Sequence, residues 1–285
     1  MLEIIIDTLL DTLLDTIKLL PFLFIAFLII ELIEHKLNNK NKKILTTSKK
    51  YGPVFGALLG IIPQCGFSVM ATNLYTTRIT TLGTLIAVYL STSDEMLPIL
   101  ISKNEEPLII IKILLIKVLF GIIYGILIDT IISKRNKKEK ENYSLCDEEH
   151  CHCEEGILKP AIKHTLNITI YILVMNFIIN IIFTYIGEDF LSKLFLKNTI
   201  FGPLITSLIG LIPNCGASVV LTELYLNNAI NMSSLISGLL TGSGTALIIL
   251  FKRNKNIKEN IFILSLLYLL GALSGVIIEL IEILI

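Results

Sequence analysis

A nine-residue motif occurs twice in this chain, 150 residues apart. Residues 60–68 read Gly-Ile-Ile-Pro-Gln-Cys-Gly-Phe-Ser, and residues 210–218 read Gly-Leu-Ile-Pro-Asn-Cys-Gly-Ala-Ser. The same shift continues far beyond the motif, and between positions 52 and 104 roughly two in five residues equal their counterparts without a gap. A repeat of this length indicates a duplicated unit, so we expect each half of the chain to form one structural unit.

Each copy of the motif places a Pro, an amide, a Cys and a Gly inside an apolar run. Within a bilayer such a run indicates a helix that stops, exposes free backbone groups and starts again. We therefore predict one re-entrant or broken helical hairpin over 51–76 and a second over 201–226.

The composition favours a membrane protein. Hydrophobic residues make up 53% of the chain, charged residues 17%, and the mean hydropathy is +0.77, whereas soluble domains carry about 25% charged residues. Several apolar runs approach the roughly 20 residues that cross a bilayer. We predict an all-α integral membrane protein of the cell membrane, with the lipid bilayer as its partner and no cleavable signal peptide.

Six full spans are predicted, which together with two hairpins make about ten membrane segments. They lie at 17–34, 80–101, 107–132, 161–186, 230–250 and 261–283. Asp7, Asp11 and Asp15 share one face of an amphipathic helix over 1–16, for which packing at the interface is favoured over a metal-collecting role. The predicted domains are that helix, membrane repeat 1 over 17–132, a charged linker over 133–159 and membrane repeat 2 over 160–285.

Loop charges predict that the two repeats face opposite sides of the membrane. Loop 36–50 is rich in Lys, whereas its counterpart 187–199 is not; loop 252–259 is basic, whereas its counterpart 103–106 is acidic. Since cytoplasmic loops carry the excess of Lys and Arg, this pattern indicates an inverted-topology repeat. The linker is then cytoplasmic and both termini lie outside.

The hairpin tips are the first candidate binding site. A Pro-x-Cys-Gly turn leaves free backbone groups, and the helix that follows presents N–H donors and a partial positive charge. The candidate substrate-binding side chains at the tips are Gln64, Cys65, Ser68, Asn214, Cys215 and Ser218. The alternative is that Pro and Gly shape a tight turn and each Cys is a small apolar filler.

Two carboxylates, Asp94 and Glu95, lie inside the span 80–101. An intramembrane carboxylate is a functional candidate, and the adjacent Met96 offers a soft thioether. The aligned positions of the other half are Gly244 and Thr245, so a single half would supply the charge. Ser93 and Ser243 are added to the site because they align with each other. A span that begins later would instead leave both acids at the interface.

Asp129 and Glu279 occupy equivalent positions, each four residues after a Gly-xxx-Gly pair. They are candidates for proton coupling. The alternative is that they lie at the membrane interface, because both are near helix ends. Asn176 and Asn180 share one face of the span 161–186, where we expect buried interhelical hydrogen bonds.

The linker holds a Cys/His/acid tract with Cys146, His150, Cys151, His152 and Cys153. Such a tract predicts weak metal capture or sensing in the cytoplasm, with a solvated linker as the alternative. Zinc-finger spacing is missing from the sequence.

Motifs for other activities are missing as well. The sequence has no Walker A, GxSxG or HExxH pattern, so we expect no enzymatic activity, no cofactor and no nucleic-acid partner. The arginines Arg78, Arg135 and Arg253 lie near loops, and we expect no fixed positive charge within the spans. Buried carboxylates without such a charge favour a cation as cargo. The sequence leaves homo-oligomerisation open.

The paired motifs resemble a bacterial and archaeal family of ten-segment heavy-metal exporters, also labelled arsenic efflux proteins or manganese transporters. Further resemblance comes from Ser-Thr-Ser-Asp-Glu at 91–95, Leu-Pro-Phe-Leu-Phe at 20–24 and Glu-His at 34–35. The resemblance covers nearly the whole chain and implies a metal or metalloid as substrate.

The resulting expectation is a secondary-active exporter that works by alternating access and exchanges its cargo for protons. A Mn²⁺-like divalent ion is the favoured cargo, since Asp94, Glu95 and Met96 would suit it, and an arsenic species comes next, for which trivalent arsenic would need Cys65 and Cys215 as thiolates. A transporter of a small organic solute or anion, and a membrane metal sensor that does not transport, are the alternatives.

Overall fold

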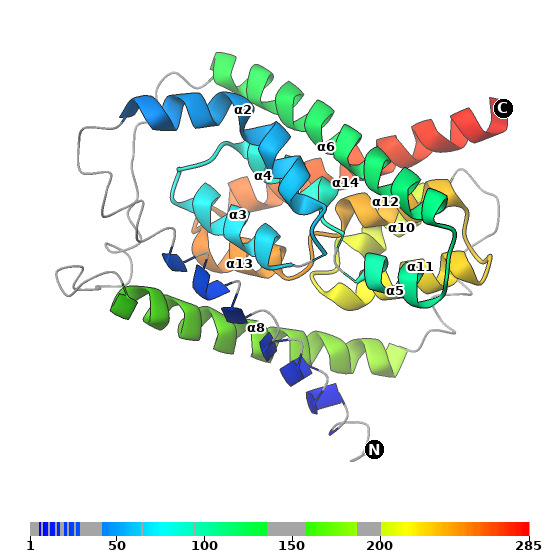
Figure 1. Ribbon diagram of the computed structural model, residues 1–285, viewed down its shortest axis with the longest axis horizontal. Coiled ribbons are helices and arrows are strands. Elements are labelled where there is room, and N and C mark those ends of the chain that lie inside the picture. The colour runs from blue at the N-terminus through cyan, green and yellow to red at the C-terminus, as the bar shows by residue number, and fades with distance from the viewer. Residues whose placement is uncertain are drawn as a thin grey trace.

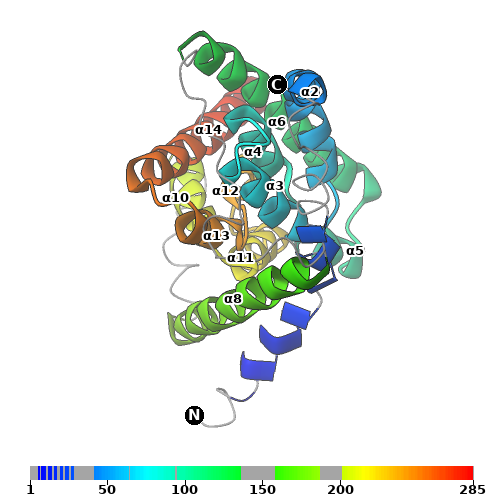
Figure 2. The ribbon, with the colours of Figure 1, turned by 90° about the vertical axis from the view of Figure 1, so that its left-hand side faces the viewer.

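The computed structural model describes residues 42–63, 65–93, 95–135, 158–186 and 201–284, together with part of 6–28. Throughout this part of the chain the regular structure is helical (Figures 1 and 2). Gln64, Asp94, the linker tract from Cys146 to Cys153 and Asp7, Asp11 and Asp15 lie outside the described residues.

Eleven helices are labelled in the described part of the chain, and they differ in length. They are α2 (Lys42–Gly60), α3 (Gly66–Thr76), α4 (Leu82–Ser91), α5 (Met96–Ser102), α6 (Pro107–Arg135), α8 (Leu158–Ile186), α10 (Gly202–Gly210), α11 (Cys215–Leu226), α12 (Met232–Thr241), α13 (Ala246–Arg253) and α14 (Ile257–Leu284). The helix order α2 to α6 therefore recurs as α10 to α14.

The turn that follows α3 is repeated after α11. Arg78 and Asn228, 150 positions apart, both have a positive φ, of 60° and 55°. The next amide bonds back in the same way in each half, from Ile79 to the Leu74 carbonyl at 2.9 Å and from Ala229 to the Leu224 carbonyl at 2.8 Å. The sequence repeat is thus also a repeat of local backbone structure.

Five helical stretches of the described chain are long and apolar enough to cross a membrane. They are Leu82–Ser102, Pro107–Ile131, Ala161–Ile181, Met232–Arg253 and Ile257–Leu284. These correspond to five of the six predicted full spans, and the span predicted over 17–34 lies largely outside the described residues.

Two of the predicted continuous spans are interrupted in the structure. Leu82–Ser102 consists of α4 and α5, and Met232–Arg253 consists of α12 and α13. Thr92 leaves the helical region with a ψ of 129°, and Gly244 has a φ of 57°. The helix of the first half therefore ends at Ser91 and that of the second at Thr241, and the next helices begin at Met96 and Ala246.

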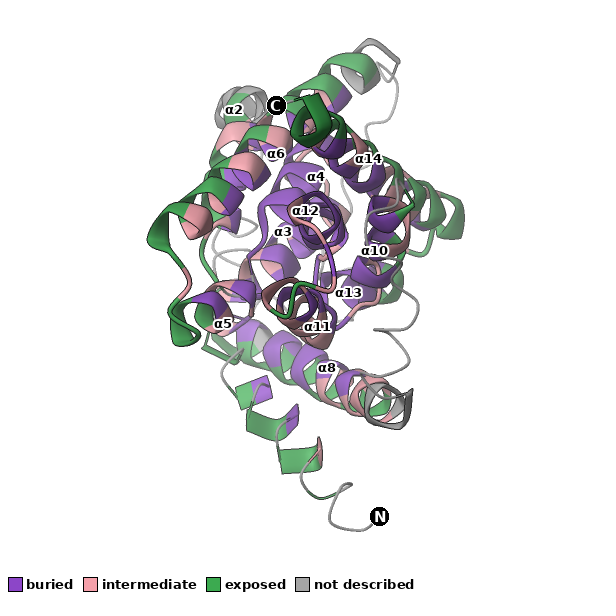
Figure 3. Cartoon of the chain, turned by 90° about the vertical axis from the view of Figure 1, so that its right-hand side faces the viewer, coloured by how far each residue is buried: buried purple, intermediate pink, exposed green. Residues whose placement is uncertain are grey.

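The interrupted helices form the centre of the bundle. In the first half α4 packs against α2 and α6, in the second α12 packs against α10 and α14, and α4 and α12 touch each other. The Leu82–Ser102 stretch is 71% buried and Met232–Arg253 is 89% buried, compared with 28% for Pro107–Ile131 (Figure 3). Exposed apolar side chains such as Leu115, Ile170 and Leu273 give the outer helices the surface that a lipid environment requires.

The remaining helices cover the sides of this centre. The short helix α3 packs against α13 of the other half, and α11 packs against α5. Figure 2 shows α8 on the side of the bundle opposite α6 and α14. Described residues of the N-terminal segment are helical, with Thr12 and Thr16 buried and Leu10, Leu14 and other leucines exposed, so the buried face of this helix is partly polar.

Candidate functional site

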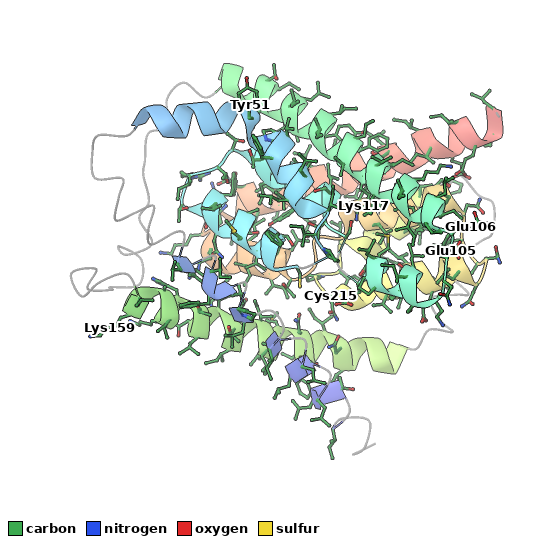
Figure 4. The ribbon with its side chains drawn as sticks, in the orientation of Figure 1. Tyr51, Glu105, Glu106, Lys117, Lys159 and Cys215 are labelled. Atoms are coloured by element: carbon green, nitrogen blue, oxygen red, sulfur yellow. The ribbon has the colours of Figure 1, made fainter. Side chains whose placement is uncertain are left out.

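The structure brings the two Cys-Gly tips together. The Sγ atoms of Cys65 and Cys215 lie 3.7 Å apart, the Cys215 thiol donating to the Cys65 sulfur, and neither cysteine is in a disulfide. Cys65 is the residue before α3 and Cys215 is the first residue of α11, so each thiol sits at a helix N-terminus. Figure 4 places Cys215 near the middle of the molecule. Two equivalent positions of the repeat thus meet at one point.

The helix N-termini make this point favourable for negative charge. Ser68 and Ser218 donate their hydroxyl protons back to the carbonyls of Cys65 (3.0 Å) and Cys215 (2.7 Å). Their oxygens keep lone pairs for a ligand, but their protons are used within their own helices.

The amide of the second tip is tied to two other helices. Asn214 is buried, caps α11 by accepting from the Gly216 amide at 3.3 Å, and donates to Oδ1 of Asn180 on α8. Asn180 in turn donates to Oγ1 of Thr12 at 2.9 Å. The interhelical hydrogen bonding predicted for Asn180 is therefore present, and Asn214 has a positional role in addition to any contact with cargo.

The helix interruptions lie beside the tips. A methyl group at Gly60 would come within 2.0 Å of Ser91 Oγ, and one at Gly210 within 2.1 Å of the Gly238 carbonyl. The residue that precedes each tip is therefore in contact with the end of α4 or α12. Each half contributes its tip and its interruption to the same region.

Hydroxyl groups from these interruptions are buried. Ser93 Oγ donates to the Ser91 carbonyl at 3.1 Å. Ser243 and Thr245 are fully buried, and within the described part of the chain their hydroxyl oxygens have no hydrogen-bond partner. Unsatisfied buried hydroxyls are costly, which makes these two oxygens candidate contacts for a polar or cationic ligand.

Glu95 and Met96 lie at the start of the short helix α5 of the first half, Glu95 just before it and Met96 as its first residue. Glu95 is partly exposed and precedes the helix, whereas Met96 is completely buried among Leu100, Ile113 and other apolar side chains. The thioether thus packs within an apolar cluster. Its predicted role as a ligand remains a prediction, as does that of the neighbouring Asp94.

Lys117 is a buried residue at the centre that our reading of the sequence missed. It lies on α6, its side chain is fully buried, and its ammonium group donates to the carbonyl of Thr92 and, at 3.0 Å, to that of Leu239 (Figure 4). The expectation of no fixed positive charge in the spans is therefore wrong. That expectation counted arginines, whereas a lysine in the middle of an apolar span is by itself a functional candidate.

Asp129 and Glu279 lie at the starts of the two central helices. Asp129 accepts hydrogen bonds from Thr81 Oγ1 (2.6 Å) and the Gly83 amide (2.8 Å) at the start of α4. Glu279 is buried and accepts from Ser233 Oγ (3.4 Å) at the start of α12. Asp129 thus caps the start of α4 through the Gly83 amide, whereas Glu279 bonds to a hydroxyl at the start of α12. The part of both acids in proton coupling remains a prediction.

An ion pair joins the two halves at one end of the bundle. Arg78 donates to both carboxylate oxygens of Glu259, at 2.8 and 3.1 Å, and Tyr75 donates to the same carboxylate. These hydrogen bonds raise the pKa of the Arg78 guanidinium above its ordinary value. The contact fixes the loop after α3 to the start of α14.

Among the described residues no cluster of three or more His, Cys, Asp or Glu could hold a metal ion. The described part of the site therefore consists of two thiols, several hydroxyls and backbone carbonyls, and one ammonium group.

Comparison with protein families identifies the chain. The ArsP_2 family, described as "Putative, 10TM heavy-metal exporter", matches residues 1–154, 131–254 and 180–282. Searches of curated proteins and of solved structures gave no match. The matches extend across nearly the whole chain and agree with the resemblance noted from its motifs. This helical, multi-pass membrane protein therefore belongs to the ArsP_2 family of heavy-metal exporters.

Proposed function

We propose that the protein is a secondary-active exporter whose cargo is a thiophilic heavy-metal ion or metalloid held between Cys65 and Cys215. The observation that carries this proposal is the 3.7 Å distance between the two Sγ atoms. Two thiolates that are each about 2.3 Å from one tetrahedral ion lie about 3.8 Å apart. A soft ion could thus bind both sulfurs without a change in the backbone.

The thiol pair favours this cargo over Mn²⁺. Manganese prefers carboxylate, carbonyl and water ligands, whereas thiolates select softer ions. A Mn²⁺-like cargo would instead depend on Asp94 and Glu95, with the buried hydroxyls of Ser243 and Thr245 as further oxygen contacts. For a metal cation, release of protons from the ligands on binding makes proton exchange the simplest form of coupling.

Alternating access follows from an inverted-repeat arrangement. The equivalent helices α6 and α14 run in opposite directions across the molecule in Figure 1, from right to left and from left to right. The cross-contacts of α3 with α13 and of α11 with α5 are equivalent under exchange of the halves. Both features support two oppositely oriented units that rock about a shared site. The loop charges favour a cytoplasmic linker with both termini outside.

The decisive experiment is transport by the purified protein in liposomes, with and without a pH gradient. The panel contains arsenite, Cd²⁺, Zn²⁺ and Mn²⁺, and the variants are Cys65→Ser, Cys215→Ser and their combination. A protein with Cys146, Cys151 and Cys153 replaced by Ser is the matched control for general effects of thiol loss.

We expect each tip substitution to reduce transport of the thiophilic cargo at least tenfold and the control to transport normally. Transport of Mn²⁺ that both tip substitutions leave intact would refute thiol ligation and favour the carboxylate site. Transport of an organic solute or anion that does not depend on any of the metals would indicate that alternative. Absence of transport in liposomes, together with loss of resistance in cells on deletion of 146–155, would instead indicate a sensor.

A further inference from the structure

Lys117 connects the two halves of the molecule through backbone carbonyls. Its ammonium group donates to Thr92 of the first half and to Leu239 of the second. Thr92 is the residue after α4, and Leu239 lies in the last turn of α12. The last carbonyls of a helix lack partners within the helix and carry partial negative charge, so two equivalent helix C-termini here face one cation.

The chain supplies this cation from one half alone. The position equivalent to Lys117 is Leu267, a fully buried residue of the apolar core. A site made by two equivalent helix ends therefore holds a single tethered cation. The helix ends themselves, not a matching pair of lysines, define the site.

We propose that the C-terminal ends of α4 and α12 form a binding site for a small cation with N–H donors, and that the Lys117 ammonium is its tethered occupant. In the present conformation the ammonium fastens the two interrupted helices to each other. Given the export function proposed above, the ammonium leaves these carbonyls when the halves move and returns when the cycle is complete. Lys117 is thus a positioning residue for the transport cycle.

Chemical rescue tests the site without any cargo. Lys117→Ala removes the propyl-ammonium part of the side chain, and leaving the carbonyls unsatisfied should lower the Tm of the purified protein by roughly 4–10 °C. Propylammonium at millimolar concentration should restore at least half of this loss. Tetramethylammonium, which has charge but no N–H, and 1-propanol, which has no charge, should not. Lys112→Ala, an exposed lysine of the same helix, is the control and should keep its Tm.

Equal effects of propylammonium and tetramethylammonium, or no loss of Tm in Lys117→Ala, would overturn the proposed site. If Lys117→Ala does not fold, Lys117→Gln provides the same comparison with a smaller cavity. The Tm comparison stands whether or not the protein transports metals.

Lys117→Arg tests the movement. A guanidinium keeps the charge and offers five donors in a rigid fork, so it should hold the carbonyls firmly and keep Tm within about 2 °C. We expect the transport rate in liposomes to fall at least tenfold. A normal rate in Lys117→Arg would refute the departure of the ammonium from the carbonyls. It would not bear on the export function, which transport by the wild-type protein tests separately.

Discussion

Gly83 and Gly125 set the distance between the central helix α4 and its neighbour α6. A methyl group at Gly83 would lie 2.2 Å from the Gly125 carbonyl oxygen and 2.5 Å from the Asp129 carboxylate. The Gly-xxx-Gly pair at 121 and 125 predicted close helix packing. Its partner Gly83, on the facing helix, belongs to the less specific small-xxx-small row of Gly83, Ala87 and Ser91, which the sequence analysis did not use.

The first prediction concerns this contact. Gly83→Ala should lower stability by about 1–3 kcal/mol because neither the backbone carbonyl nor the capping carboxylate can move away without loss of hydrogen bonds. Gly216→Ala is the matched control, since the nearest atom to its new methyl group would be 3.5 Å away. Thermal unfolding in detergent measures both, and an equal Tm for the two variants would contradict the packing argument.

At the scale of the helix, the carboxylates at the starts of α4 and α12 are the features that follow from the repeat. Both Asp129 and Glu279 were found from their equivalent positions, but the sequence left open whether they lie at the interface or carry protons. The hydrogen bonds to Thr81, Gly83 and Ser233 give them a structural role at the two helix starts.

The second prediction separates capping from proton coupling. Asp129→Asn removes the charge at the start of α4 and should cost about 0.5–2 kcal/mol of stability, with the pH dependence of transport preserved. Thr130→Val, at an exposed neighbouring position whose hydroxyl bonds to its own helix at Ile126, is the control. A flattened pH profile in Asp129→Asn, with Tm unchanged, would instead favour the proton-coupling role.

The interruptions of the two central helices mark the limit of the sequence analysis. Five of the predicted spans are present, because their length and hydropathy are local properties. The breaks at 92–95 and 242–245 were not predicted, since a hydropathy window does not register where backbone hydrogen bonds end. At Thr92 the free carbonyl is satisfied by Lys117, which is 25 residues away in the sequence. Only the tertiary fold supplies this partner.

At the scale of the whole molecule, contacts between the two halves determine how they are assembled. The repeat correctly suggested that the two tips converge, because equivalent elements of a duplicated fold meet near their shared axis. The ion pair of Arg78 with Glu259 could not be foreseen, since Arg78 aligns with Asn228 and the pair has no counterpart in the other half.

The third prediction measures this ion pair. A double-mutant cycle with Arg78→Met and Glu259→Gln should give a coupling of about 0.2–1 kcal/mol, a low value because the Arg78 side chain is 39% exposed. The readout is the Tm of the wild-type protein, both single variants and the double variant. Additive losses would show that the contact does not stabilise the joined halves.

The fourth prediction uses the two tip thiols as a reporter of the conformation. In a protein whose linker cysteines are Ser, mild oxidation should join Cys65 to Cys215, since 3.7 Å between the Sγ atoms requires little movement. Mass spectrometry of the peptides detects the bond, and we expect the oxidised protein to stop transporting until a reductant is added. Full transport by the oxidised protein would mean that the tips need not separate.

A tethered ammonium inside the bilayer also has an electrical consequence. One elementary charge that crosses the full membrane at 100 mV changes its energy by about 2.3 kcal/mol, so a shift of Lys117 through a quarter of the field would change it by about 0.6 kcal/mol. The turnover of liposomes that carry 100 mV diffusion potentials of opposite sign should then differ about sevenfold, because the two polarities change the energy in opposite directions. The same turnover at both polarities would mean that no net charge is displaced in the rate-limiting step.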